Sequence, residues 1–340
     1  MNAVGYKTPG PIERDDSLID IDLPMPEATG HDILVKVKAV SVNPVDTKIR
    51  ASGAPEEGEE WKVIGWDASG IVSALGPDVV RFKTGDEVFY AGSIRRSGTN
   101  AEFHLVDERI VGRKPTVLDW AEAAAMPLTT LTAWEMLFDR LDVRRPVLGA
   151  ANAVLIIGGA GGVGSIATQL ARTQTDLTVI TTASRQETVD WARDMGAHHV
   201  IDHSKPIAEQ VADLGIGAPA FVFSTTQTDA HAAEIAELIA PQGRFGLIDN
   251  LENANQFKAK SVSIHWELMY TRSTFATADM DAQGKLLDQA AKLLEEGKLK
   301  TTLTERLSPI GAATMKKAHA MSESGRMIGK VVIEGFETED

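Results

Sequence analysis

Cysteine is absent from the 340 residues of this chain. Its absence excludes disulfide bonds, thiolate nucleophiles and every cysteine-based zinc or iron–sulfur site. The chain also lacks an apolar run of the ~20 residues that a membrane helix needs, so no membrane partner is expected. A basic start followed by an apolar stretch, typical of a secretory signal, is missing as well. We therefore expect a cytoplasmic protein.

Positive charge is scarce, because 34 Lys and Arg stand against 48 Asp and Glu, giving a formal net charge of −14. Such a field repels polyanions, and no nucleic-acid partner is expected. The composition, 43% hydrophobic and 24% charged, is typical of a soluble globular protein. We therefore expect the binding partner of this protein to be a small molecule.

Two kinds of pattern divide the chain. Residues 1–115 contain short strands separated by Gly, Pro, Asp and Asn, which predicts a compact β-barrel. A helical pattern then follows, interrupted at Pro127. After it, apolar strands alternate with helices, as in a doubly wound parallel sheet. The tail is again rich in strands. The sequence thus predicts an α/β protein with a catalytic domain of residues 1–127 and 272–340 and a dinucleotide-binding domain of residues 128–271.

The stretch "VLIIGGAGGVGSIATQLAR" carries the strongest motif of the chain. Gly159, Gly161 and Gly164 form G-x-G-x-x-G between an apolar strand and an amphipathic helix. Glycine lets the backbone approach a pyrophosphate, and the N–H groups of Gly162 and Val163 at the helix start face the anion. The alternative is a tight turn of purely structural purpose. In this context the motif predicts dinucleotide binding.

The end of the second strand indicates which dinucleotide binds. An NAD site needs an acidic residue there, but "LTVITTAS" ends in Ser184 and Arg185, and Glu187 comes only on the following helix. Ser184 can hydrogen-bond a 2′-phosphate and Arg185 can pair with it. These residues favour NADPH. The alternative is that Arg185 is a solvated residue of the first helical turn.

Two histidines of "HHVIDH", His199 and His203, are four residues apart. In the predicted strand they stand about 13 Å apart, which is too far for one metal ion. We expect no metal site there. His203, at the carboxyl end of the strand, is instead expected to border the adenosine phosphate.

Three further stretches of the sequence, taken with the glycine motif, resemble those of a known protein family. With the glycine motif and the return to the β domain, "SVNPVDTKIR", "GWDASGIVSALGPDVVRFKTGDEVF" and "AAAMPLTTLTAWEMLFDRL" make the whole chain resemble the medium-chain dehydrogenase/reductase superfamily. Within it, the chain is similar to the quinone oxidoreductase branch and to the group labelled zinc-binding alcohol dehydrogenases. The resemblance implies a GroES-like β-barrel catalytic domain beside a Rossmann domain.

The zinc of that label is not expected here. In the zinc enzymes that the chain resembles, a Cys begins the segment that here starts at Asn43, and a Gly-His-Glu supplies a ligand where this chain has Gly65, Trp66 and Asp67. Indole offers no lone pair to a metal, and Asp67 alone cannot hold zinc. The sequence predicts no metal, and the stretch around Trp66 is expected to form an apolar floor of the active site.

The resemblance also implies site residues. Asn43 is expected to approach the nicotinamide ribose and the substrate, while Trp66 and Tyr90 border the acceptor and Tyr90 supplies a hydroxyl donor. The alternatives are core packing for Trp66 and Tyr90 and a turn-forming role for Asn43. Further cofactor contacts are implied for Thr132, Ser224, Thr225, Leu247, Ile248 and Arg326.

Without a metal to polarise a plain ketone, the favoured acceptors are quinones or the C=C bond of α,β-unsaturated carbonyls. We therefore expect an NADPH-dependent reductase of such acceptors. Two alternatives stay open, a zinc-type alcohol dehydrogenase and a non-catalytic NADPH-binding protein. The strand "SVSIHWEL" is expected to pair with its own copy across a two-fold axis, as in family members, which predicts a homodimer.

Overall fold

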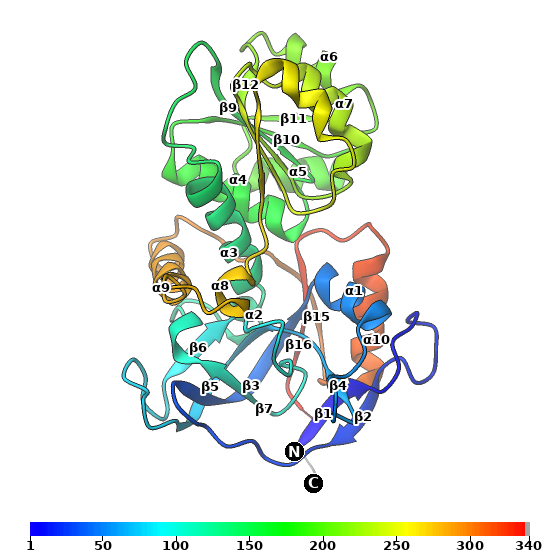
Figure 1. The fold of residues 1–340 in the computed structure, drawn as a ribbon, viewed down its shortest axis with the longest axis vertical. Coiled ribbons are helices and arrows are strands. Elements are labelled where there is room, and N and C mark those ends of the chain that lie inside the picture. The colour runs from blue at the N-terminus through cyan, green and yellow to red at the C-terminus, as the bar shows by residue number, and fades with distance from the viewer. Residues whose placement is uncertain (337–340) are drawn as a thin grey trace. The chain divides into compact units, whose positions relative to one another are not determined.

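The computed structural model describes residues 1–336, and its contacts group these residues into two compact units. The first unit comprises Met1–Leu128, Tyr270–Gly297 and the chain from Thr301 onward. The second comprises Thr129–Met269 and Lys298–Lys300. Figure 1 shows the chain coloured from blue to red, with both the blue and the red ends in the first unit. Within residues 1–336, no helix has both the length and the apolar character that a membrane crossing requires.

The first unit is built on two sheets. The smaller sheet has the order β2-β1-β4, and the larger has the order β15-β16-β3-β5-β6-β8, with β7 pairing β3 off this path. Apart from the parallel pair β15 and β16, the strand pairs of both sheets are antiparallel. The strands are β1 (Asn2–Tyr6), β2 (Ile19–Asp22), β3 (Asp32–Val42), β4 (Lys62–Val63), β5 (Asp67–Leu75), β6 (Glu87–Tyr90), β7 (Phe103–Asp107), β8 (Val111–Arg113), β15 (Leu303–Leu307) and β16 (Lys330–Glu334).

Helices cover these sheets. Small side chains allow α2 to lie close to the larger sheet, because Ala121, Ala124 and Ala125 pack against Ala39 of β3 and Val332 of β16. The capping box of Asp119 and Glu122 fixes the start of α2. The helices of this unit are α1 (Pro44–Ser52), the 3₁₀ helix η1 (Glu108–Ile110), α2 (Trp120–Ala124), α8 (Thr271–Thr274), α9 (Ala282–Glu295) and α10 (Ala312–Glu323).

The second unit is a six-stranded parallel sheet with helices between its strands. Its order is β11-β10-β9-β12-β13-β14, so successive strands are added on one side of β9 up to β11 and on its other side from β12 onward. The strands are β9 (Ala151–Ile157), β10 (Thr178–Thr182), β11 (His199–Ile201), β12 (Pro219–Ser224), β13 (Arg244–Leu247) and β14 (Ser263–Trp266). The helices are α3 (Pro127–Trp134), the π-helix η2 (Glu135–Arg140), α4 (Gly162–Gln174), α5 (Gln186–Asp194), α6 (Ile207–Asp213), α7 (Thr228–Leu238) and the 3₁₀ helix η3 (Ala254–Lys260).

The predicted fold class is confirmed, because apolar strands such as β9 and β12 occupy the centre of a parallel sheet. Both are almost fully buried, as continuous apolar runs predict. Pro127 falls at the break between α2 and α3, since proline suits a first helical turn. The predicted strand around His199 is shorter than expected. It ends at Ile201, so His203 lies beyond it.

Candidate functional site

A glycine cradle joins the end of β9 to the start of α4. The N–H of Gly158 donates to Oγ1 of Thr182 at 3.0 Å, which fixes the turn against β10. A Cβ atom on Gly159 would lie 1.6 Å from Oγ1 of Thr181, and one on Gly164 would lie 2.2 Å from the carbonyl oxygen of Gly158. Only glycine therefore allows the turn and the helix to approach each other so closely.

The start of α4 is open to a ligand. Its N-cap is Gly161, and no side chain caps the helix, so the first N–H groups, including those of Gly162 and Val163, have no side-chain acceptor there. A Cβ on Gly161 would meet only the Gly158 carbonyl oxygen, at 3.5 Å. An uncapped end of a 13-residue helix beside a glycine turn suits a pyrophosphate. These residues therefore fit a dinucleotide.

Predicted cofactor contacts gather at the carboxyl ends of the neighbouring strands. Thr225 follows β12, and its hydroxyl donates to the Ile157 carbonyl at 2.8 Å, beside the cradle. Ser224 is buried, with its hydroxyl 3.0 Å from that of Thr228, while Leu247 ends β13. Ile248 follows it and is half-buried. These residues stand at the carboxyl ends of β12 and β13, next to the point between β9 and β12 where the strand order reverses, and ligands of such sheets bind at that point.

At the end of β10, Arg185 contacts Glu187, an acidic residue of the following helix. Ser184 is exposed, and Arg185 is the N-cap of α5. The guanidinium Nη1 of Arg185 lies 3.0 Å from Oε1 of Glu187, which is in the first turn of the helix. A 2′-phosphate would have to compete with this carboxylate. Both side chains are partly exposed, so the ion pair is weak.

Three other predicted contacts differ in exposure. Thr132 is buried on α3, whereas His203 is exposed, with its ring 6.5 Å from that of His231. Arg326 is exposed in the loop between α10 and β16 of the first unit. Among residues 1–336, no cluster of three or more His, Asp or Glu side chains is arranged to hold a metal ion.

In the first unit, a buried polar cluster surrounds Asp67. The amide nitrogen of Asn43 donates to Oδ2 of Asp67 at 2.8 Å, and the ammonium of Lys330 donates to the same oxygen at 3.1 Å. Lys330 also donates to Oδ1 of Asn43. The other oxygen of Asp67 accepts the Leu128 N–H at 2.7 Å. Both polar ends of the Asn43 amide are therefore already bonded.

Burial raises the pKa values of the acidic residues in this cluster. It raises the pKa of Asp46 to about 7, although the Asn43 backbone N–H and the Lys330 ammonium oppose the shift. It also raises the pKa of Asp67, again against the Lys330 ammonium. Asp46 caps α1, because its Oδ2 accepts the N–H of Asn43 at 2.7 Å. Lys330 is 287 residues from Asn43, so no local motif of the sequence indicates that the two side chains meet.

The two aromatic residues predicted to border the acceptor are both fully buried. Tyr90 differs from the expectation of a donor facing the acceptor, because its hydroxyl lies 3.1 Å from Nδ1 of His104. Nε2 of His104 is 2.9 Å from the Ser97 carbonyl, which can only accept, so Nδ1 must accept the Tyr90 proton. Burial lowers the pKa of His104 to about 4, which keeps the ring neutral. Trp66 instead packs edge-on against Tyr270.

Comparisons with known proteins agree with these features. Residues 29–125 match the family model of the alcohol dehydrogenase GroES-like domain, and residues 195–333 match that of the zinc-binding dehydrogenases. A zinc-type alcohol dehydrogenase-like protein of Staphylococcus aureus is 40% identical, over 98% of this chain and 99% of its own. A Rhizobium etli crystal structure, named for a zinc-dependent alcohol dehydrogenase, has 68% identity and a TM-score of 0.98, covering 99% of each chain. The quinone oxidoreductase of Coxiella burnetii has 26% identity and a TM-score of 0.80, also covering 99% of each.

A GroES-like unit joined to a parallel-sheet unit with a glycine cradle defines a dehydrogenase architecture. The chain belongs to the medium-chain dehydrogenase/reductase superfamily, in its quinone oxidoreductase-like branch. It is an oxidoreductase of that family.

The zinc in the names of these relatives does not fit the residues present here. The segment that would carry a first ligand offers the Asn43 amide, whose oxygen already accepts from Lys330. Trp66 has no lone pair to give, and both oxygens of Asp67 accept hydrogen bonds. The Lys330 ammonium thus lies where a cation would meet Asn43 and Asp67. Zinc needs three ligands in an open site, and this cluster does not supply them.

Proposed function

We propose that the protein is a zinc-independent, NADPH-dependent reductase of quinones or α,β-unsaturated carbonyl compounds. The observation that carries the proposal is the Lys330 ammonium between Asn43 and Asp67, in the segments where zinc relatives place ligands. Without a Lewis acid, acceptors whose negative charge spreads into a conjugated oxygen are the easiest to reduce. The similarity to a quinone oxidoreductase supports the same acceptor class.

The bound cofactor supplies the hydride. The tasks of this chain are to bind and orient it and to exclude water. Backbone N–H groups of Gly162 and Val163, which follow the N-cap Gly161, are proposed to hold the pyrophosphate, and Ser184 and Arg185 the 2′-phosphate. The further proposed cofactor contacts, which the resemblance implies, are Asn43, Thr132, Gly159, Gly164, His203, Ser224, Thr225, Leu247, Ile248 and Arg326.

A steady-state assay with a panel of quinones and enones tests this function. We expect NADPH oxidation that depends on the acceptor and persists after dialysis against a chelator. Stoichiometric, tightly bound zinc together with turnover of simple alcohols would instead favour the zinc-type alcohol dehydrogenase. Saturable NADPH binding without turnover of any acceptor would favour a non-catalytic dinucleotide-binding protein.

We also propose a cytoplasmic homodimer that pairs through β14. This strand lies at the edge of the parallel sheet, where its outer backbone groups are available to another strand. Trp266, the last residue of β14, and Leu268 just after it are 55% and 56% exposed, so this edge presents two neighbouring large apolar side chains that a second copy would cover. Light scattering is expected to give the mass of two chains. A mass near one chain at micromolar concentration would contradict the dimer.

A further inference from the structure

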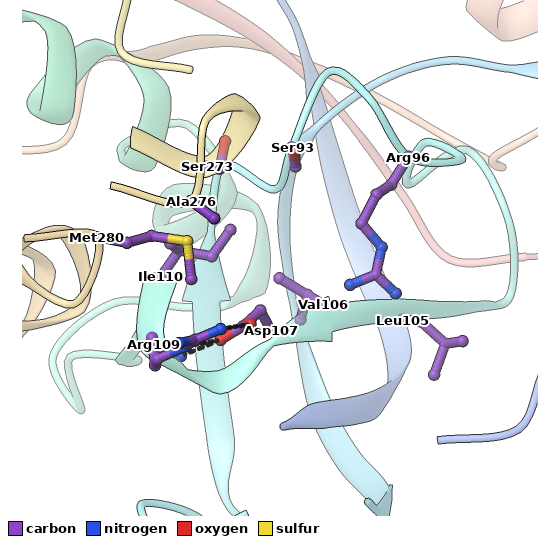
Figure 2. A pocket seen from close by; sticks show the side chains of 10 residues that line it. All are labelled: Ser93, Arg96, Leu105, Val106, Asp107, Arg109, Ile110, Ser273, Ala276 and Met280. Carbon is purple, nitrogen blue, oxygen red and sulfur yellow. Dashed lines mark hydrogen bonds and ion pairs between the residues drawn. The ribbon is translucent and has the colours of Figure 1, made fainter. Parts of the chain in front are cut away.

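The cavity of the first unit is lined by arginines that already have partners. Its volume is about 160 Å³, and Figure 2 shows Arg109 paired with Asp107 on one side of it and Arg96 on the other. Arg96 forms a bidentate pair with Asp32, with distances of 2.7 and 2.9 Å. Because carboxylates hold both guanidinium groups, this cavity is a poorer match for a nucleotide phosphate than the glycine cradle of the second unit.

In the second unit, a chain of hydrogen bonds links the glycine cradle to helix α5. The indole Nε1 of Trp191 donates to the Ser165 hydroxyl at 2.8 Å, and that hydroxyl donates to the Gly159 carbonyl at 3.4 Å. Ser165 lies in the first turn of α4 and is 0% exposed, whereas Trp191 is half-buried on α5. One serine oxygen thus joins the turn after β9, the start of α4 and the middle of α5.

The chemistry of its groups fixes the direction of this hydrogen-bond chain. An indole N–H can only donate and a backbone carbonyl can only accept. The Ser165 hydroxyl therefore accepts from Trp191 and gives its own proton to Gly159. A hydroxyl that accepts one hydrogen bond becomes a stronger donor of the next, because each bond polarises its neighbour. The indole therefore strengthens the longer bond that reaches the cradle.

The Gly159 carbonyl is the part of the cradle that this chain holds. The N–H of the same residue donates to the Thr182 carbonyl at 3.1 Å, so Gly159 is fixed between β10 and α4. The N–H groups of Gly162 and Val163 belong to the same first turn of α4 as Ser165. A turn held through both of its backbone groups keeps these donors in one arrangement before a nucleotide arrives, which lowers the entropic cost of binding.

We propose that Trp191 and Ser165 are positioning residues, which hold the glycine cradle in the conformation that binds the pyrophosphate of the nucleotide. The inference rests on the proposed function, because it concerns the proposed NADPH site, and both residues act on that site through the Gly159 backbone. Arg185 is the N-cap of α5, so one helix carries both the proposed 2′-phosphate contact and the start of the hydrogen-bond chain.

Nucleotide binding to the full-length protein, without any acceptor, tests the inference. Fluorescence titration gives the dissociation constants of NADPH and NADH, and calorimetry gives that of adenosine 2′-monophosphate, which has no pyrophosphate. We expect Ser165→Ala to weaken NADPH and NADH equally, about tenfold, and to change adenosine 2′-monophosphate by less than about twofold. Arg185→Ala has a different signature, because it should weaken NADPH and adenosine 2′-monophosphate but not NADH.

A double-mutant cycle distinguishes a chain from two independent bonds. Trp191→Phe keeps an aromatic ring but removes the indole donor, and we expect it to weaken both dinucleotides about threefold. In the Ser165→Ala background the indole no longer acts on the cradle, so adding Trp191→Phe should weaken binding no further. Two independent bonds would instead give additive losses, about 30-fold in total.

Ser69→Ala is the matched control for stability. Ser69 is also 0% exposed, and its hydroxyl donates to the Trp120 carbonyl at 2.6 Å in the first unit. We expect Ser69→Ala and Ser165→Ala to lower Tm by similar amounts, about 1–3 °C each. Ser69→Ala should leave the dissociation constants of both dinucleotides unchanged, so a loss of binding in Ser165→Ala alone cannot come from lower stability.

Three results would overturn the inference. They are unchanged binding of both dinucleotides by Ser165→Ala, additive losses in the double variant, and an equal loss of adenosine 2′-monophosphate binding, which would mean that α5 itself has moved. If Ser165→Ala does not fold, unchanged dinucleotide binding by Trp191→Phe decides against the chain. A wild type that binds neither dinucleotide would end the proposed function as well, whereas a wild type and variants that all bind normally would end this inference alone.

Discussion

Replacing Lys330 with methionine is expected to lower the free energy of unfolding by about 3–5 kcal/mol. Methionine fills a similar volume but leaves Asp67 and Asn43 without the ammonium to which both are bonded. The side chains of Lys330 and Asp67 are 4% and 0% exposed, so water cannot replace the lost ammonium as a hydrogen-bond donor. Chemical denaturation at pH 7 measures the loss. Lys285→Met is the matched control, because its ion pair with Asp281 is exposed, and it should change stability by less than about 0.5 kcal/mol.

The loss should grow with pH. Without the ammonium, burial raises the pKa values of Asp46 and Asp67 further, whereas in the unfolded chain both ionise near their usual value of about 4. A folded pKa above the unfolded one means that stability falls as pH rises between the two. The variant should therefore come closest to the wild type near pH 4 to 5. Adding Asp67→Asn should restore part of the loss. A Lys330→Met variant as stable as the wild type would refute the buried charge pair.

Replacing Arg185 with alanine is expected to weaken NADPH binding about 30- to 100-fold while leaving NADH binding nearly unchanged. Arg185 follows β10, which ends without an acidic residue of its own, and its charge is the one proposed to meet the 2′-phosphate. Fluorescence titration with each nucleotide measures the two dissociation constants. Glu187→Gln should strengthen NADPH binding, by a smaller factor than Arg185→Ala weakens it, because it removes the carboxylate that competes with the 2′-phosphate for Arg185.

A control on the same helix isolates this effect. Arg193 lies near the end of α5, where its exposed side chain approaches Asp190 at 3.8 Å. Arg193→Ala should change neither dissociation constant by more than about twofold. Equal weakening of NADPH and NADH by Arg185→Ala would contradict a 2′-phosphate contact. It would indicate instead that the N-cap of α5 had been disturbed.

Much of the fold followed from local patterns. The glycines of the cradle and the apolar strand before them lie within a dozen residues, so one short stretch predicted the β9-turn-α4 unit. The alternation of strands and helices after it predicted the doubly wound sheet for the same reason. In these segments the secondary structure depends mainly on residues close together in the chain, and this is why short sequence patterns could predict it.

The buried cluster around Asp67 was only half predictable. The sequence drew attention to Asn43 and Trp66 because they replace ligands of known motifs, but their neighbours Lys330 and Tyr270 come from the far end of the chain. The hydroxyl of Tyr90 contacts His104, which belongs to another strand, so no local pattern could show this partner. Glu187 was set aside by position, although the first turn of α5 brings it to Arg185. Tertiary pairing decided the cases of Lys330, Tyr270 and Tyr90, whereas the local geometry at the start of α5 decided that of Glu187.

The position of β16 in the larger sheet limits how this chain can fold during its synthesis on the ribosome. β16 lies between β15 and β3 in the larger sheet, so the N-terminal strands lack a neighbour until the ribosome has synthesised the final segment. By contrast, residues 129–269 contain every strand of the parallel sheet. The nucleotide-binding unit can therefore fold first, although domains usually fold in order from the N-terminus. Until the carboxyl-terminal strand has been synthesised, the second half of β3, from Ala39 to Val42, has no partner on one side, whereas β7 already pairs with its first half.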